Sequence, residues 1–428
     1  MSFSGLIEKY LISGKHNKKN MQILKDVLVK VKVAPEELMS IRQNAEKFRK
    51  ELAADLKKEG LSSEVVIGGS LAKGTIIKGD FDCDIFVRFE NNNNNLSNLL
   101  EKVLKKHKPH RVHGSRDYFQ LIKDNIQYEI VPVLKVKNQK DAKNVTDMSP
   151  MHVSWIKKKL TKNPPVIDEI ILAKTFCKAN RIYGAESYIG GFSGHVLDIL
   201  VVYYGSFINL LKAAKKWQIQ TVIDVEAHGN KKELNKSKLS PLIVFDPVDK
   251  TRNAAAALTN QKLELFKRTA AEFLNKPSKS FFIKKKITED SLKKLKGNNQ
   301  LILVKLTPLK GKRDVVGAKL LKCYEHIKKH LEKNEFNLKK SGWEWDKDAL
   351  IWFILDKAPL TKEQTRIGPP LHEKKSAQNF MEKHASTYVK EDRLYAKIKR
   401  EYTMASKLIS NLINSRYIKT RTKLAIIK

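Results

Sequence analysis

Two short motifs in the amino-terminal part of the chain combine residue types that could bind a phosphate group and a metal ion. The first is Gly68-Gly69-Ser70 with Lys73 one turn later, and the second is Asp82-Cys83-Asp84. Residues two apart in a strand point to the same face, so Asp82 and Asp84 are expected to project together, away from Cys83. Paired carboxylates suit Mg²⁺, and a glycine-rich turn lets backbone N–H groups approach a phosphate closely. The motifs therefore predict metal-dependent chemistry on a phosphorylated substrate.

A phosphate loop of the GxxxxGK[ST] type is the main alternative for this segment. Gly69 and Gly74 have the required separation, but Thr75 stands where that motif has lysine. A Gly-Gly-Ser turn or an Asp-x-Asp pair alone is common in solvated turns. The two together, twelve residues apart, are far more specific.

The combination resembles the polymerase-beta-type nucleotidyltransferase signature. That resemblance implies a third carboxylate on a neighbouring strand, and Glu129 is the natural candidate. The alternative for Glu129 is an exposed strand residue without a chemical role. The resemblance implies that Asp82, Asp84 and Glu129 are the catalytic residues and hold two Mg²⁺ ions.

The elements that would position these residues alternate between helix and strand. Apolar residues recur at three- and four-residue spacing over residues 35–56, which predicts an amphipathic helix. Strands are predicted at 64–67, 85–89 and 126–131, and the asparagine run 91–95 is predicted to be a solvated loop.

The rest of the chain is mostly helical in pattern as far as residue 274. Helical blocks are predicted at 166–183 and 195–217, with a turn at 246–249. Beyond Pro277, a strand at 301–306, a helix at 317–332 and a strand at 351–355 are predicted, followed by a Lys-rich helical region after Arg366.

The charge of the chain indicates its partner. The 428 residues carry a net charge of +37, which favours nucleic acid because each neutralised phosphate releases counterions. The three cysteines lack metal-knuckle spacing, and the first twenty residues lack a hydrophobic signal core, so we expect a cytoplasmic protein with no membrane partner.

Further stretches narrow the resemblance to the archaeal (class I) CCA-adding enzymes, which are tRNA nucleotidyltransferases. The similar stretches are Asp147–His152, Leu172–Phe176, Tyr183–Tyr188, Gly191–Gly194, Asp246–Asn253 and Ile367–Pro370. The resemblance runs from about Lys25 to the carboxyl terminus. It implies an α+β protein with a polymerase-beta-like nucleotidyltransferase head (1–155), a helical neck (156–276), and a ferredoxin-like body with a helical tail (277–428).

The same resemblance implies the substrates and their contacts. The enzyme would add C, C and A to the 3′ end of tRNA from CTP and ATP, gripping the acceptor arm with the body and tail. A homodimer is compatible with the sequence, which does not decide the oligomeric state. The positions that match nucleotide-binding residues of the family are Gly69, Ser70, Lys73, His152, Lys174, Tyr183 and Arg252, of which Arg252 matches the arginine that faces the base.

Three departures from the family pattern occur near the site: Lys73 replaces an arginine, Leu71 an aromatic residue and Glu129 an aspartate. None removes a required functional group. Two alternatives remain open, a poly(A) polymerase or other terminal nucleotidyltransferase, and a catalytically inactive RNA-binding protein on the same fold.

Overall fold

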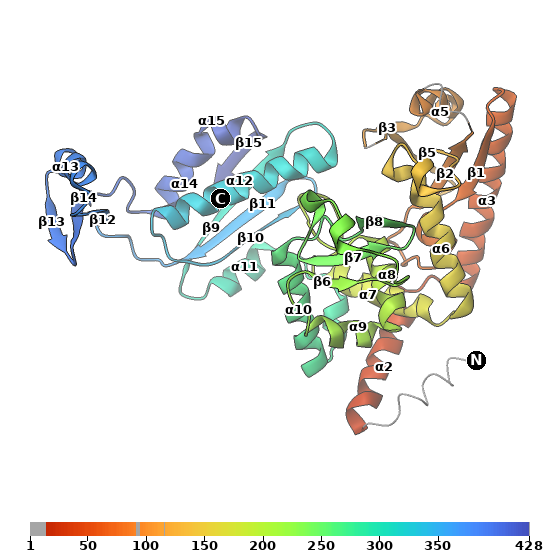
Figure 1. Cartoon of the computed structure of the whole chain (residues 1–428), viewed down its shortest axis with the longest axis horizontal. Helices are drawn as coiled ribbons and strands as arrows, with labels where there is room; N and C mark the ends of the chain where they lie inside the picture. Colours follow the sequence, from red (N-terminus) through yellow and green to blue (C-terminus); the bar gives the residue numbers. More distant parts are fainter. Residues whose placement is uncertain (1–13, 91–94, 115, 428) are drawn as a thin grey trace. The chain divides into compact units, whose positions relative to one another are not determined.

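The structure, a computed structural model, describes residues 14–90, 95–114 and 116–427, which divide into two compact units (Figure 1). The first unit ends at Lys285 and the second begins at Lys286. The mixture of helices and sheets confirms the predicted α+β class.

A five-stranded sheet forms the first part of unit one. Its strands lie in the order β1-β2-β5-β4-β3, and the only parallel pair among them is β2 with β5. The strands are β1 (Ser63–Ile67), β2 (Cys83–Phe89), β3 (His110–Val112), β4 (Tyr118–Lys123) and β5 (Ile126–Leu134). The three predicted strands are confirmed as β1, β2 and β5, whereas β3 and β4 were missed.

Strand β5 continues through Pro132, where the sequence pattern predicts an end. Pairing with β4 stops at Ile130, and the Pro132 carbonyl accepts a hydrogen bond from Arg116 on that side. The N–H and C=O of one strand residue point to the same side of the strand. On this side β4 no longer pairs with β5 at Pro132, so the sheet loses no hydrogen bond although proline has no N–H.

Helix α3 (Pro35–Lys58) covers one face of this sheet and confirms the predicted helix. Its buried residues follow the predicted periodicity, and the ring of Phe48 lies 4.6 Å from that of Tyr128 on β5, centroid to centroid. Helix α5 (Leu96–Leu104), which was not predicted, packs into the same core. Asn95 caps α5 by accepting hydrogen bonds from the backbone N–H groups of Ser97 and Asn98. Residues 91–94 of the predicted asparagine loop lie outside the described residues.

The second part of unit one is a helical layer with a small sheet in the order β6-β7-β8. The helices are α2 (Gly14–Val31), α6 (Ser149–Lys162), α7 (Val166–Ala179), α8 (Gly194–Tyr204), α9 (Phe207–Ala214) and α10 (Asn260–Asn275). The strands are β6 (Thr221–Ile223), β7 (Leu242–Asp246) and β8 (Asp249–Asn253), and the predicted turn at 246–249 joins the last two. Helix α2 packs against α7, where Lys32 forms an ion pair of 2.7 Å with Asp168.

Two helix predictions in this layer are wrong in their bounds. The block 166–183 ends at Ala179, because Arg181 adopts a left-handed conformation with φ of 60° that a helix cannot continue. The block 195–217 is two helices, since α8 stops at the left-handed Gly205 and Ser206 caps α9.

Length and apolar character decide which of the described helices could cross a bilayer. No single one of them has the length and apolar character to cross a bilayer. The pair α8 and α9 passes that test by length and composition only, with a bend of 94° between its members.

Unit two is built on a βαββαβ pattern. Its elements are β9 (Gln300–Pro308), α12 (Arg313–Lys333), β10 (Leu338–Trp345), β11 (Ala349–Leu355), α14 (Ala405–Asn414) and β15 (Thr422–Ile427). The sheet order β10-β11-β9-β15, with every pair antiparallel, is the ferredoxin-like arrangement. The short helices α11 (Glu289–Lys296) and α15 (Arg416–Lys419) flank it.

The prediction of a helical region after Arg366 is only partly confirmed, because α14 and α15 lie there but strands lie there as well. A separate three-stranded sheet, β12-β14-β13, lies between β11 and α14 in the chain. It consists of β12 (Glu363–Pro370), β13 (Thr387–Lys390) and β14 (Arg393–Lys399), together with helix α13 (Lys374–Lys383). In β14 the buried Leu394 and Ala396 alternate with solvent-facing residues, but the many lysines hide this two-residue period.

Candidate active site

The predicted carboxylates lie on adjacent strands of the five-stranded sheet. Asp84 on β2 is the register partner of Glu129 on β5. Cys83 and Ile85 point into the core, so the side chain of Asp84 emerges on the opposite face, as the two-residue period predicts. Asp82 directly precedes β2 and is exposed.

The negative charges of these carboxylates repel one another, and this repulsion makes the carboxyl groups of Asp84 and Glu129 harder to ionise. Burial, reinforced by the charge of Glu129, raises the pKa of Asp84 to about 7, although Lys73 counteracts the rise. Burial also raises the pKa of Glu129, and the partial burial of the Asp82 carboxyl group raises its pKa although the residue as a whole is exposed. Carboxylates that repel one another on one face of a sheet suit a divalent cation, which removes the repulsion.

The carboxylate oxygens of Asp82, Asp84 and Glu129 do not all lie within 4.8 Å of one another. Glu129 Oε1 accepts a hydrogen bond of 2.7 Å from Gln120 Nε2 on β4. Among the described residues, two other groups have ligand atoms that all lie within 4.8 Å of one another: His152, His195 and Asp246, and Glu51, Asp55 and His107.

The Gly-Gly-Ser turn lies directly against Asp84. The N–H of Gly68 donates a hydrogen bond of 2.8 Å to the carbonyl of Asp84, and Gly69 has a φ of 55°. A Cβ atom on Gly69 would lie 1.5 Å from Asp84 Oδ2. Only glycine therefore lets the turn approach the carboxylate so closely. Ser70 and Lys73 follow in the short helix α4 (Gly69–Lys73).

Lys73 and Lys174 converge on Asp198, a fully buried residue of α8. Lys73 Nζ lies 2.7 Å from Asp198 Oδ2, and Lys174 Nζ lies 3.5 Å from Asp198 Oδ1. Lys174 also donates a hydrogen bond of 2.9 Å to Thr75 Oγ1. Burial lowers the pKa of Lys174 to about 8, against the opposing charge of Asp198. Burial alone would raise the pKa of Asp198, but Lys174 and Lys73 hold it below its ordinary value.

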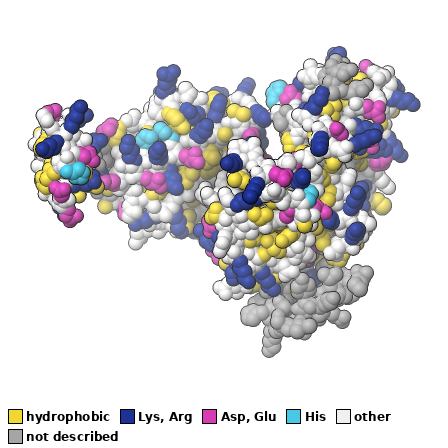
Figure 2. Space-filling model, in the orientation of Figure 1, with side chains coloured by type: hydrophobic (Ala, Val, Ile, Leu, Met, Phe, Trp, Pro, Cys, Tyr) yellow, Lys and Arg dark blue, Asp and Glu magenta, His cyan; other side chains and the backbone are white. Residues whose placement is uncertain are grey.

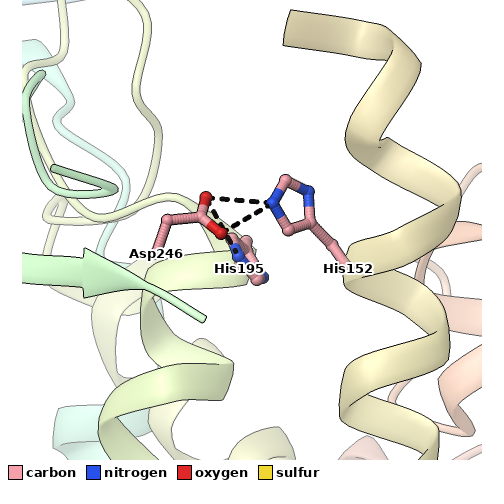
Figure 3. Close-up of side chains that lie close together, drawn as sticks. All are labelled: His152, His195 and Asp246. Carbon is pink, nitrogen blue, oxygen red and sulfur yellow. Dashed lines mark hydrogen bonds and ion pairs between the residues drawn. The ribbon is translucent and has the colours of Figure 1, made fainter. Parts of the chain in front are cut away.

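His152 and Arg252 converge on a second buried carboxylate, Asp246 at the end of β7. His152 Nε2 lies 2.9 Å from Asp246 Oδ2, which also forms an ion pair with Arg252 of β8. Figure 3 shows the rings of His152 and His195 both directed toward Asp246, with His152 coming from its helix. Although burial opposes the shift, the His152 hydrogen bond and the nearby positive charges hold the pKa of Asp246 below its usual range.

Tyr183 lies beside the start of α8. The ammonium group of Lys178 is 4.8 Å from the centre of its ring. A Cβ atom on Gly194 would lie 2.8 Å from the Tyr183 hydroxyl and 3.7 Å from Lys174 Cε, so both side chains border this glycine.

The structure thus brings four of the predicted residues together in two pairs, each pair around one buried aspartate. Lys73 joins Lys174 at Asp198, and His152 joins Arg252 at Asp246. Sequence reasoning missed Asp198, Asp246 and His195 as site residues. The available signal was Asp198, a charged residue within an otherwise apolar stretch.

Three models of known protein families match parts of this chain. Residues 168–283 match the second domain of tRNA nucleotidyltransferase, residues 300–420 the C-terminal domain of the CCA-adding enzyme, and residues 19–160 the Second Messenger Oligonucleotide or Dinucleotide Synthetase domain. A solved structure of Cid1, described as having RNA terminal uridylyl transferase activity, aligns with a TM-score of 0.51 at 14% identity. It covers 64% of this chain and 100% of that one, and shows the shared nucleotidyltransferase fold.

Curated relatives match over most of their length. The CCA-adding enzyme of Nanoarchaeum equitans is 34% identical over 86% of this chain and 93% of that relative. The CCA-adding enzyme of Methanocaldococcus jannaschii is 30% identical over 92% of this chain and 90% of that relative. The chain therefore belongs to the family of archaeal CCA-adding enzymes, the tRNA nucleotidyltransferases whose signature its sequence carries.

Proposed function

We propose that this enzyme completes the 3′ end of tRNA by adding C, C and A in sequence from CTP and ATP, without a nucleic-acid template. In each addition the terminal 3′-hydroxyl attacks the α-phosphorus of the nucleotide, the bond to the bridging oxygen breaks, and pyrophosphate leaves. The observation that carries the proposal is the contact between Asp84, beside Glu129, and the glycine turn at Gly69.

The residues divide the work by their chemistry. Asp82, Asp84 and Glu129 would hold Mg²⁺, which when bound assists the attacking hydroxyl and the leaving pyrophosphate. The backbone of Gly69 lies against Asp84, and Ser70 and Lys73 follow it in α4, which suits this turn to bind the triphosphate. The remaining nucleotide-binding candidates are Lys174, Tyr183, His152 and Arg252, with Arg252 assigned to the base.

We propose that catalysis and tRNA binding belong to different parts of the chain. We assign residues 1–155 to the catalytic head, 156–276 to the neck and 277–428 to the body and tail. The family model for the CCA-adding C-terminal domain, over residues 300–420, favours this function over a poly(A) polymerase or an inactive RNA-binding protein. A cytoplasmic location is consistent with the three cysteines, which are free and buried. A homodimer stays a prediction.

The decisive experiment is incubation of the purified enzyme with a tRNA transcript that lacks its last three nucleotides. Labelled CTP should be incorporated twice and labelled ATP once, with addition of Mg²⁺ required and pyrophosphate released. A poly(A) polymerase would ignore CTP and extend with ATP, and an inactive RNA-binding protein would incorporate neither.

Binding of tRNA is expected to depend strongly on salt and weakly on sequence. The net charge is +37, and Figure 2 shows Lys and Arg side chains spread over the visible face. Log affinity should fall linearly with log salt concentration, because each phosphate contact releases counterions. A salt titration with full-length tRNA and an unrelated RNA hairpin measures both slopes. A flat response would contradict electrostatic binding.

A further inference from the structure

Two buried aspartates each contact two of the side chains that are assigned to the nucleotide. We infer that Asp198 and Asp246 are positioning residues, which hold these side chains in the orientation that a nucleotide triphosphate meets. Asp198 holds Lys73 and Lys174, and Asp246 holds His152 and Arg252. The inference rests on the proposed function, because it requires these side chains to bind nucleotide.

Asp198 joins three separate elements. Its carboxylate is fully buried in α8, while Lys73 ends α4 and Lys174 lies in the middle of α7. Its two oxygens are divided between the lysines, at 2.7 Å and 3.5 Å. A free lysine side chain has many rotamers and therefore a large conformational entropy. Lysines already fixed by Asp198 would lose less of that freedom when a triphosphate binds, which strengthens binding.

Asp246 fixes a second pair in the same way. Its carboxylate is also fully buried, and its partners come from α6 and β8. His152 Nε2 lies 3.0 Å from one carboxylate oxygen and 2.9 Å from the other, while Arg252 pairs with Oδ2. The guanidinium remains about one-third exposed, so Arg252 keeps part of its surface available to a ligand.

The charges favour an anion over a metal ion at these clusters. His152, His195 and Asp246 have ligand atoms close enough for a metal. However, Arg252 already pairs with Asp246 Oδ2, the oxygen closest to His195, and its positive charge would repel a cation. At Asp198, one carboxylate faces two lysines and leaves one positive charge for a phosphate.

The test compares three aspartate-to-asparagine variants, each of which removes one charge at nearly constant volume. Asp198→Asn and Asp246→Asn are the test variants, and Asp249→Asn is the matched control. Asp249 is buried in the same hairpin as Asp246, but bonds to Gln139 and Thr251. Calorimetry with CTP should show about ten- to a hundredfold weaker binding for Asp198→Asn, and wild-type affinity for Asp249→Asn. Asp246→Asn should reduce the preference of single-turnover addition for the correct nucleotide.

A double-mutant cycle distinguishes positioning from general destabilisation. If Asp198 acts through Lys73 and Lys174, Asp198→Asn should weaken CTP binding by a smaller factor in a Lys73→Met background than in the wild-type enzyme, where both lysines are present. Asp198→Glu should recover part of the affinity, because it restores the carboxylate. If Asp198→Asn fails to fold, the Asp198→Glu variant enters the same cycle.

The outcomes separate the two proposals. Fully additive losses, or CTP binding by Asp198→Asn equal to that of the Asp249 control, would overturn the positioning role of Asp198. Unchanged nucleotide preference in Asp246→Asn would overturn the role of Asp246. Failure of the wild-type enzyme to bind CTP would instead refute the proposed function.

Discussion

Asp84→Asn should slow the addition of both CMP and AMP by about 10²–10³-fold, the scale of losing one stabilising group around a reacting phosphate. Asparagine has the shape of aspartate but no negative charge, so the variant would lose a metal ligand while keeping the packing of β2. Affinity for tRNA should persist, because Asp84 lies beside Glu129 and the Gly69 turn in unit one, whereas tRNA binding is assigned to the body and tail.

Single-turnover addition to tRNA transcripts ending in the discriminator base and in CC measures both steps. Glu64→Gln is the matched control, since Glu64 is a carboxylate on the adjacent β1 that pairs with Arg88. The control should react at the wild-type rate. Asp82→Ala and Glu129→Ala should show losses similar to that of Asp84→Asn. A Glu129→Ala enzyme with a near-normal rate would mean that the third carboxylate lies elsewhere.

Arg252→Ala is expected to lower the efficiency of addition by about ten- to a hundredfold and to blur the choice between CTP and ATP. Losing a hydrogen bond to a charged group costs on the order of 1.5–3 kcal/mol. The guanidinium is anchored by Asp246 and partly exposed, so it can offer its remaining N–H groups to a base edge. The sequence has one turn that we propose to bind the triphosphate, so in this proposal the same pocket serves both nucleotides.

The measurement is single-turnover addition to tRNA ending one nucleotide short, with CTP and ATP supplied in turn. Lys250→Ala is the control, because Lys250 is an exposed cation on the same strand, β8. It removes the same charge and should leave discrimination unchanged. If Arg252→Ala lost tRNA affinity alone, with its choice of nucleotide intact, Arg252 would belong to the general basic surface.

The prediction of the carboxylate pair on neighbouring strands succeeded because its signals are local. The two-residue period of a strand places Asp84 opposite the buried Cys83 and Ile85, and the structure has this alternation. Glu129 could be chosen because it belongs to the next recognisable apolar strand, and the register pairs it with Asp84. Gly69 was recognised as part of a turn, although its contact with Asp84 Oδ2 was not foreseen.

The elements that the sequence pattern misjudged are those whose form depends on neighbours. Strand β5 passes through Pro132 because no partner strand needs its N–H at that point. The strands after Arg366 were missed because their many lysines hide the two-residue period of a strand. These strands are stabilised by pairing with one another, which the sequence pattern does not show.

The sequence by itself determined the nucleotidyltransferase signature, the strand period of its carboxylates, and the basic charge that favours RNA. Only the tertiary structure decided how the side chains proposed to bind the nucleotide are held. Lys73 and Asp198 are 125 residues apart in the chain, and Asp246 is 94 residues from His152. Spacing along one helix or strand predicts which residues share its face, but contacts between elements depend on how the whole core packs. A buried aspartate is tolerated where that packing brings a cation or hydrogen-bond donors to it, as the lysines do at Asp198.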